Sequence, residues 1–321
     1  MARKLDPSAR VDASGVRTRP LSGRDSKVSA ASFRQPMKPG STFAEFLASL
    51  PDFLQAADLM SLARAIADAH RGDKVVALAM GAHNIKVGLT PLYRDLMERG
   101  IITSVALNGA CIVHDFEIAY AGMSSEDVGA ELKDGSFGMA RETSEWLNGV
   151  IKSGHRRGLG LGYAVGEAIW EEGLPHREAS LLAAAYRNKV VATVHVAIGT
   201  DIIHMHPLAD GEATGGASMT DFRRFCAVVG ELQGGVYLNI GSAVILPEVF
   251  LKALTLVRNL GRKVDDITTA DMDFIRQYRP GVNVVGRPTA GGGRGFRLTG
   301  PHEILVPLLF GAVLDLLGRE A

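Results

Sequence analysis

The runs KVVALAM (residues 74–80), IITSVAL (101–107), KVVATVHVAI (189–198) and GVYLNI (235–240) decide the fold of this chain. Each run is largely apolar and has the length of a strand, and residues with helical periodicity separate one run from the next. Strands without polar alternation are typical of a parallel sheet, because helices then bury both of its faces. The sequence therefore predicts a doubly wound α/β fold with a mostly parallel sheet.

Shorter strands and a series of helices complete this Rossmann-like pattern. The expected further strands are 264–269 and 282–285, and the expected helices are 41–50, 51–70, 89–99, 139–153, 160–172, 176–187, 218–232, 247–260 and 301–319. Ser41 or Thr42 is the predicted N-cap of the first helix. The stretch GLGLGYAVG (158–166) follows a helical region, so we interpret it as helix packing in preference to a cofactor loop. No G-x-G-x-x-G motif follows the first strand.

The N-terminal segment differs from the rest of the chain. Residues 1–40 contain nine Lys or Arg against three Asp or Glu and few large apolar side chains. Such a segment buries too little apolar surface to fold alone. We expect a basic arm that is either solvated or packed on its own body or on another subunit. Residues 41–321 show no linker and no repeat, which predicts a single α/β domain.

The composition excludes several classes of protein. The 321 residues are 46% hydrophobic and 22% charged, and 35 Lys and Arg balance 35 Asp and Glu, so no overall field favours nucleic acid or an anionic membrane. No apolar run reaches the roughly 18 residues of a membrane span, and the N-terminus lacks a signal-peptide core. Two cysteines, Cys111 and Cys226, are expected to be buried free thiols. These features predict a cytoplasmic protein with a small-molecule substrate.

A doubly wound sheet places its functional site beyond the carboxyl ends of the strands. The segments expected there are rich in Gly, Asn, Ser and Thr, which let a backbone approach a ligand and bond to it. They are Gly81-Ala82-His83-Asn84, Asn108-Gly109-Ala110, Gly199-Thr200-Asp201, Gly241-Ser242 and Thr268-Thr269-Ala270.

These segments, together with MGAHNIKVGLTPLYRDLMERGIITSVALNGA (80–110) and EILVPLLFGAVL (303–314), resemble the deoxyhypusine synthase family. The resemblance implies an NAD cofactor and a homotetramer with sites at a subunit interface. It also implies that cofactor contacts are made by Asn84, Asn108, Gly109, Ala110, Asp201, Gly241, Thr269 and Ala270.

The chain departs from the family where the substrate would bind. His114 stands where the family has a glutamate, His206 lies near a family aspartate and Leu246 replaces a histidine. Arg287 replaces the lysine that forms an imine with the substrate, and guanidinium stays protonated and cannot attack. Pro301-His302 replaces an Asp-Ala pair of the NAD site. We therefore expect no deoxyhypusine synthesis, and instead a small anionic or neutral substrate.

Several roles remain open among the polar residues. Arg287, Arg294 and Arg297 are able to bind a carboxylate or phosphate, or they are solvated or paired with Asp271 and Asp273. His114, His206, Arg287 and Lys86 are the candidate catalytic residues, with Lys86 as a relocated nucleophile if the chain transfers aminobutyl groups from a polyamine.

Histidines offer further alternatives. His204 and His206 form an H-x-H pair that could share a metal with His114, although structural or acid–base roles are commoner. His195 lies on the preceding strand, and His83 and His302 are further strand-end candidates. A last alternative is an inactive homologue that acts as a binding subunit.

Overall fold

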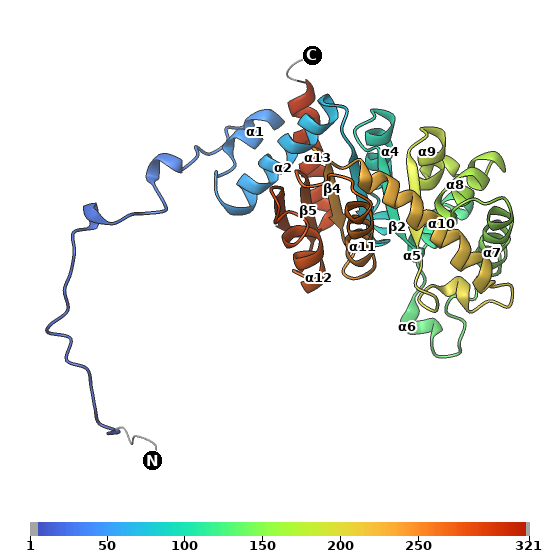
Figure 1. Ribbon diagram of the computed structural model, residues 1–321, viewed down its shortest axis with the longest axis horizontal. Coiled ribbons are helices and arrows are strands. Elements are labelled where there is room, and N and C mark those ends of the chain that lie inside the picture. Colours follow the sequence, from blue (N-terminus) through green and yellow to red (C-terminus); the bar gives the residue numbers. More distant parts are fainter. Residues whose placement is uncertain (1–5, 319–321) are drawn as a thin grey trace.

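One parallel sheet of six strands forms the centre of the computed structural model, which describes residues 6–318 (Figure 1). The strands are β1 (Val76–Met80), β2 (Ser104–Asn108), β3 (Val191–His195), β4 (Val236–Ile240), β5 (Thr268–Asp273) and β6 (Arg294–Thr299). Their order is β3-β2-β1-β4-β5-β6, and all five neighbouring pairs are parallel. This is the doubly wound order, so the predicted fold class is confirmed.

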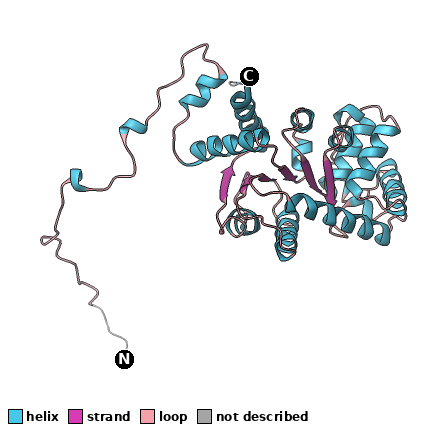
Figure 2. Cartoon of the chain, turned by 45° about the horizontal axis from the view of Figure 1, so that its top comes forward, coloured by secondary structure: helices cyan, strands magenta, loops and turns pink. Residues whose placement is uncertain are grey.

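Helices cover both faces of this sheet (Figure 2). The larger set comprises α1 (Phe43–Ser49), α2 (Leu54–Arg71), α3 (His83–Lys86), α4 (Thr90–Glu98), α5 (Gly109–Ala121), α6 (Val128–Glu131), α7 (Arg141–Arg156), α8 (Leu161–Glu171), α9 (Leu181–Arg187), α10 (Gly211–Gly230), α11 (Ile245–Asn259), α12 (Tyr278–Pro280) and α13 (His302–Gly318). The short elements are the 3-10 turns η1 (Leu21–Gly23), η2 (Ala30–Ser32), η3 (Arg177–Ala179) and η4 (Ile202–His204), and the π-helical η5 (Gly281–Gly286).

Alternate residues of each central strand enter two different hydrophobic clusters. Leu78 of β1 packs in the cluster that includes α2 and α13, whereas Ala77 and Ala79 face the cluster built on α10 and α11. In β4, Leu238 and Tyr237 divide in the same way. Both faces of these central strands are therefore buried, which is why they read as apolar runs.

Local signals placed several helices correctly. Thr42 caps α1 in a capping box with Glu45, as the sequence predicted. The glycines of 158–166 serve helix packing, because a Cβ on Gly162 would lie 2.4 Å from the carbonyl oxygen of Ala192 and one on Gly166 would lie 2.4 Å from that of Leu182. The interpretation as packing is confirmed.

Two predicted strands are wrong. Residues 282–285 lie in η5, where the buried Val284 packs against the α10–α11 cluster and its carbonyl oxygen accepts a hydrogen bond from Thr269 Oγ1. Tertiary packing overrides the β propensity of these valines. The strand expected at 264–269 is β5, which runs to Asp273, so its carboxyl end lies beyond Thr268-Thr269-Ala270. The last strand of the sheet is β6, which the sequence analysis did not predict.

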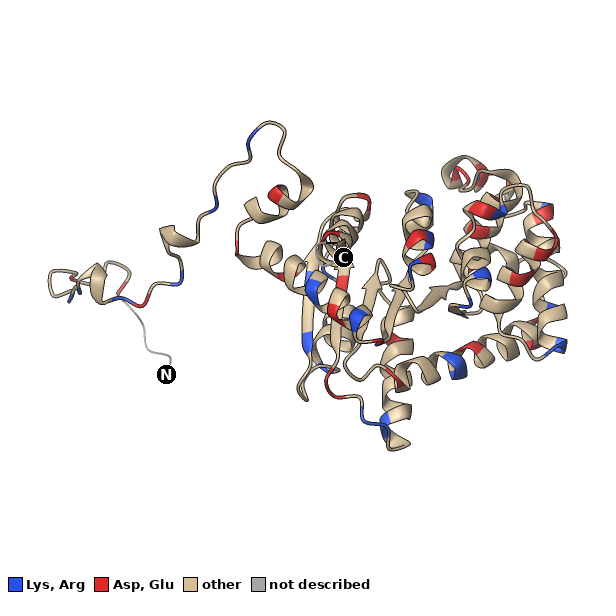
Figure 3. Ribbon diagram, turned by 90° about the horizontal axis from the view of Figure 1, so that it is seen from above, with Lys and Arg blue, Asp and Glu red and all other residues tan. Residues whose placement is uncertain are grey.

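The N-terminal segment lies away from this body. Residues 6–40 are exposed except for the half-buried Ser32, and Figure 1 shows them extending from α1. Acidic and basic residues are interspersed along the ribbon of the body, and the arm carries basic residues together with a few acidic ones (Figure 3). Within residues 6–318, no helix combines the length and apolarity needed to cross a membrane.

Candidate functional site

The carboxyl ends of β1 and β4 meet where the strand order reverses. The Gly81 N–H donates to the Ile240 carbonyl oxygen at 3.1 Å, and a Cβ on Gly81 would lie 2.3 Å from the carbonyl oxygen of Gly241. Only glycine allows the two backbones to approach so closely. In sheets of this order the ligand crevice opens at this point.

A cavity of about 200 Å³ lies beside this point, beyond the ends of β2 and β3. It brings together four residues that the sequence analysis selected, namely Lys86, Ala110, His114 and Asp201. Glu117 and Glu126 also line it. The cavity is the candidate active site because it concentrates titratable side chains at the functional edge of the sheet.

His114 belongs to a chain of three side chains. Ser124 Oγ donates to Glu117 Oε2 at 2.6 Å, and His114 Nδ1 lies 2.6 Å from the same Oγ. A hydroxyl has one proton, so Nδ1 is the donor to Ser124 and the lone pair is on Nε2. Thr143 Oγ1 donates to Glu117 Oε1 at 3.0 Å and holds the carboxylate from its other side. The arrangement fixes the tautomer of His114 and leaves Nε2 as a base.

The environment of His114 keeps its ring neutral. Burial lowers the pKa of His114 below its ordinary value, and the charge of Lys86 lowers it further, against the opposite effect of Glu117 and Glu126. A neutral imidazole at neutral pH can accept a proton from a bound substrate.

Asp201 is the second titratable group of the cavity. It is 8% exposed, and its Oδ2 has no hydrogen-bond partner. A Cβ on Gly109 would lie 1.9 Å from that oxygen, so the carboxylate sits against the first residue of α5. Burial raises the pKa of Asp201 to about 6, so an acid and a carboxylate form coexist near neutral pH.

A second cluster of polar groups lies at the reversal point itself. His302, at the start of α13, is 1% exposed, and both of its ring nitrogens lack a hydrogen-bond partner. Its Nε2 lies 3.8 Å from Asp273 Oδ1, and its ring centroid is 5.5 Å from that of His83. A Cβ on Gly241 would meet the His302 ring at 2.5 Å. His302 therefore occupies space directly over the end of β4.

The predicted cofactor residues divide into two groups. Asn108, Gly109, Ala110, Asp201 and Gly241 lie at the carboxyl edge. Asn84 is fully buried there, and its side chain bonds to Gly81, Ile240 and Tyr93, so it already ties β1 to β4. Thr269 and Ala270 lie inside β5 and are fully buried, which places them below the edge.

The remaining catalytic candidates lie elsewhere. His206 Nδ1 accepts the Leu208 N–H outside the cavity lining. Arg287 directly follows η5. The carbonyl oxygen of the next residue, Pro288, accepts a hydrogen bond from the Arg258 side chain. The same guanidinium donates to the carbonyl oxygen of Val264, which precedes β5. Arg287 therefore lies near the amino edge of the sheet within one chain.

The histidines do not assemble into a metal site in the described part of the chain. His204 Nδ1 accepts the N–H groups of Gly199 and Asp201, and His195 Nε2 lies 3.0 Å from Thr193 Oγ1. Across residues 6–318, no three His, Cys, Asp or Glu side chains are arranged to hold a metal ion.

Glu117, Ser124 and Glu126 are site residues that the sequence analysis missed. His114 and Glu117 are three residues apart on α5, a spacing that places side chains on one face of a helix. The signal was present, but it is visible only after residues 109–121 are recognised as a helix.

No family model matches the chain, and no curated protein matches its sequence. Solved structures do resemble it. One is AgrE in complex with ornithine and NAD⁺, with a TM-score of 0.52 and 13% identity over 81% of this chain and 33% of AgrE. Another is the cyanobacterial arginine dihydrolase ArgZ, with a TM-score of 0.51 and 16% identity over 83% of this chain and 33% of ArgZ. They also include a candidate deoxyhypusine synthase from Entamoeba histolytica (0.50, 12%, 87% and 95%). The chain spans a third of AgrE and ArgZ. At these identities the likeness establishes the fold that the resemblance implied.

Proposed function

We propose that this chain is an NAD-binding enzyme that carries out acid–base chemistry on a small polar substrate in the cavity that contains His114 and Asp201 (the edge cavity). The observation that carries the proposal is the pairing of His114 and Asp201 in one cavity. Their surroundings bring the two pKa values closer together, downward for the histidine and upward for the carboxyl. Titratable groups with shifted pKa values in one cavity mark a candidate functional site.

Each residue has a distinct role in this proposal. His114 Nε2 accepts a proton from the substrate, while the Ser124–Glu117 chain holds the ring and stabilises the imidazolium that forms. Asp201 supplies or accepts a second proton through its unbonded Oδ2. Lys86 offers a positive charge to an oxyanion that develops in the cavity.

The charges of the lining select the substrate class. Among the described residues that line the cavity, Glu117, Glu126 and Asp201 face a single cation, Lys86, and none is an arginine. The lining favours a neutral or cationic substrate over the anionic one that Arg287 suggested. Loss of the imine-forming lysine position still argues against deoxyhypusine synthesis.

NAD fits the edge in part. Among the described residues Asp201 Oδ2 is an acceptor without a donor, as a ribose hydroxyl requires, whereas the space beside Gly81, Gly109 and Gly241 is filled by the Gly241 backbone, the Asp201 carboxylate and the His302 ring. The cavity is smaller than the roughly 300–1,000 Å³ of typical ligand sites, so the remainder of a dinucleotide would extend along the open edge. NAD would supply a hydride acceptor. The likeness in fold to AgrE, solved with NAD⁺, supports this assignment.

A calorimetric titration with NAD tests the proposal. We expect the wild type to bind, and Asp201→Asn to bind about tenfold more weakly, because a charge-assisted hydrogen bond is lost. Asp25→Asn, on the exposed arm, is the matched control and should bind like the wild type. Absence of binding by the wild type, or equal binding by Asp201→Asn, would refute the cofactor assignment.

A second candidate function rests on the position of Lys86 in the same cavity. Once the polyamine has lost a hydride to NAD and become an imine, the Lys86 amine would add to the imine carbon and release the diamine part of the polyamine, which leaves the aminobutyl group bound to Lys86 as an imine. Incubation with NAD and spermidine, followed by borohydride reduction and peptide mass spectrometry, separates the two functions. An adduct on Lys86 that is absent in Lys86→Arg would favour the transferase, whereas no adduct would favour acid–base chemistry.

A further inference from the structure

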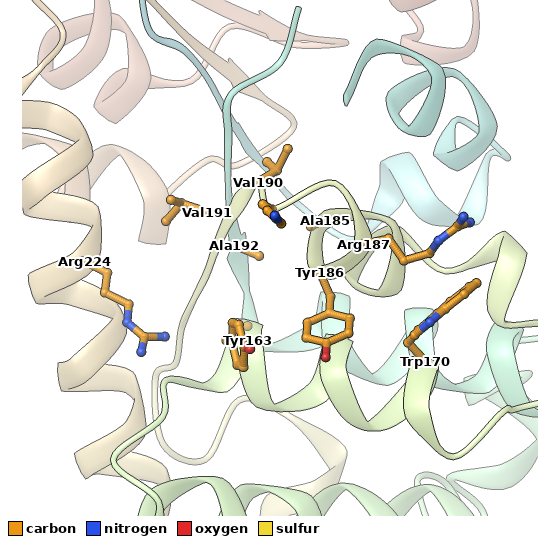
Figure 4. Close-up of a pocket in the computed structure, with 11 residues that line it drawn as sticks. Tyr163, Trp170, Ala185, Tyr186, Arg187, Val190, Val191, Ala192 and Arg224 are labelled. Atoms are coloured by element: carbon orange, nitrogen blue, oxygen red, sulfur yellow. The ribbon is translucent and has the colours of Figure 1, made fainter. Parts of the chain in front are cut away.

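A second cavity lies on the outer side of the edge strand β3, toward the start of the strand. Its volume is about 620 Å³, within the range of roughly 300–1,000 Å³ that small-molecule sites occupy. Side chains of α8, α9 and α10 converge on it, together with the first residues of β3 (Figure 4). It is three times the volume of the edge cavity and shares no lining residue with it.

The cavity exists because α10 covers only the second half of this strand edge. Asp221 Oδ2 accepts the Val194 N–H at 2.9 Å, and Ser218 Oγ accepts the Val196 N–H at 3.2 Å. These side chains take the place of a neighbouring strand. The covering starts at Val194, so Val191, which is 39% exposed, and Ala192 face the cavity.

The cavity carries positive charge. Arg187, Lys189 and Arg224 line it, and none of the aspartates and glutamates within residues 6–318 does. Arg187 is engaged elsewhere, since it lies over the Trp170 ring at 4.3 Å and pairs with Glu178 at 3.3 Å. Arg224 lies 4.0 Å from Asp221, and no ion pair of the described residues involves Lys189. Two cations are therefore available to an anion.

Two tyrosine rings form the floor between these cations. The centroids of Tyr163 and Tyr186 are 5.4 Å apart in an edge arrangement, and Tyr163 is 40% exposed. The Tyr186 hydroxyl donates to Glu171 at 2.9 Å, which holds that ring. Figure 4 shows Arg224 reaching toward Tyr163 from the opposite side, and its guanidinium carbon is 5.9 Å from the ring centroid. A planar ligand ring would find stacking partners here.

The backbone of Lys189 supports a role for its side chain. Its φ is +56°, in the left-handed region that glycine adopts without steric cost. Strained residues of this kind gather at functional sites. A glycine would suit this turn after α9 better, yet the position supplies one of the two cations that are available to an anion.

We propose that this cavity binds a small planar anion of the nucleotide class, with its ring against Tyr163 and Tyr186 and its phosphate between Lys189 and Arg224. Rings and cations on one surface recognise such ligands through stacking and charge together. The site is separate from the edge cavity and independent of the function proposed for it.

Calorimetry with AMP, adenosine and inorganic phosphate tests this site. We expect AMP to bind, with adenosine and phosphate each at least about tenfold weaker, because each lacks one of the two contacts. Lys189→Gly should weaken AMP binding about tenfold or more while folding at least as well as the wild type, since it also relieves the backbone strain. Arg224→Gln should weaken binding similarly.

Two controls locate the ligand. Lys252→Ala removes an exposed lysine of α11 and should leave AMP affinity unchanged. Asp25→Asn, on the exposed arm, should also leave it unchanged. Unchanged affinity in both Lys189→Gly and Arg224→Gln, loss of affinity in Lys252→Ala, or equal affinity for phosphate and AMP would overturn the proposal.

Discussion

The carboxyl group of Asp201 is held in surroundings that disfavour its charge. Its pKa rises from the ordinary 3.8 to about 6 because the group is buried, with only a weak opposing hydrogen bond from Thr200. A folded-state pKa above the unfolded one stabilises the protein fully below about pH 3.8. That stabilisation is lost as the pH rises from about 3.8 through 6. Above pH 6 the buried charge lowers the free energy of unfolding by about 3 kcal/mol. Such a cost is expected of a functional residue rather than of one retained for stability.

Asp201→Asn should therefore raise the free energy of unfolding at pH 8, by up to about 3 kcal/mol, because the amide never ionises. The gain should shrink as the pH is lowered through 6 toward 4. Urea unfolding at several pH values measures both effects, and Asp25→Asn serves as the control because Asp25 is exposed. A loss of stability at pH 8, or a gain that does not depend on pH, would contradict the assignment of a buried, raised pKa.

Individual site residues were predictable where a strand end or the family resemblance located them. Asn108 directly follows an apolar run and Asp201 comes shortly after another, and the rule that ligands bind beyond strand ends placed both at the carboxyl edge. Ser124 follows a helix and a turn, and its bond to His114 depends on how the chain returns at Gly122, whose φ is +72°. No spacing in the sequence encodes that return.

At the scale of elements, hydrophobic pattern was reliable where strands were buried and apolar, and it failed where they were buried and polar. Residues 268–273, TTADMD, form a strand that is buried throughout. Asp271 is tolerated inside it because Asn239 of β4 donates to its carboxylate at 2.8 Å. That partner is distant in the sequence, so the strand was placed too early, and β6, which pairs with it, was not recognised.

Helix α8 is expected to depend on the absence of one side chain. A Cβ on Gly162 would lie 2.4 Å from the Ala192 carbonyl oxygen and 2.9 Å from the Thr193 nitrogen, and neither backbone atom can move without disturbing β3. Gly162→Ala should lower the free energy of unfolding by about 1–3 kcal/mol.

Gly149 of α7 is the matched control for this change. It lies inside a helix with nothing within 4 Å of a built Cβ. Gly149→Ala should raise stability by about 0.5–1 kcal/mol, because alanine favours the helix. Thermal and urea unfolding of the two variants would decide the point. If both changes were stabilising, the close packing of α8 on β3 would be refuted.

For the whole molecule, the carboxyl edge is apolar at several separate points. Ile198 follows β3 and is 63% exposed, Phe274 follows β5 and is 60% exposed, and Ile304 opens α13 and is 60% exposed. Exposed apolar side chains gathered on one face are typical of an interface. We propose that the chain forms the homotetramer that its resemblance to deoxyhypusine synthases implies, with this edge at a subunit interface.

Light scattering should then give the mass of four chains at micromolar concentration. The double variant Phe274→Lys with Ile304→Lys should dissociate, because each change removes about 1.5–3 kcal/mol of apolar burial and introduces charge into the interface. Leu260→Lys is the control. Leu260 is 72% exposed, but it follows the C-terminal end of α11, away from the carboxyl edge of the sheet. A monomeric wild type would refute the assembly. Equal dissociation by the control variant would show that the carboxyl edge is not the interface.

Because the edge cavity opens on this face, the double variant should also bind NAD more weakly if a neighbouring subunit completes the site, whereas Leu260→Lys should bind NAD like the wild type.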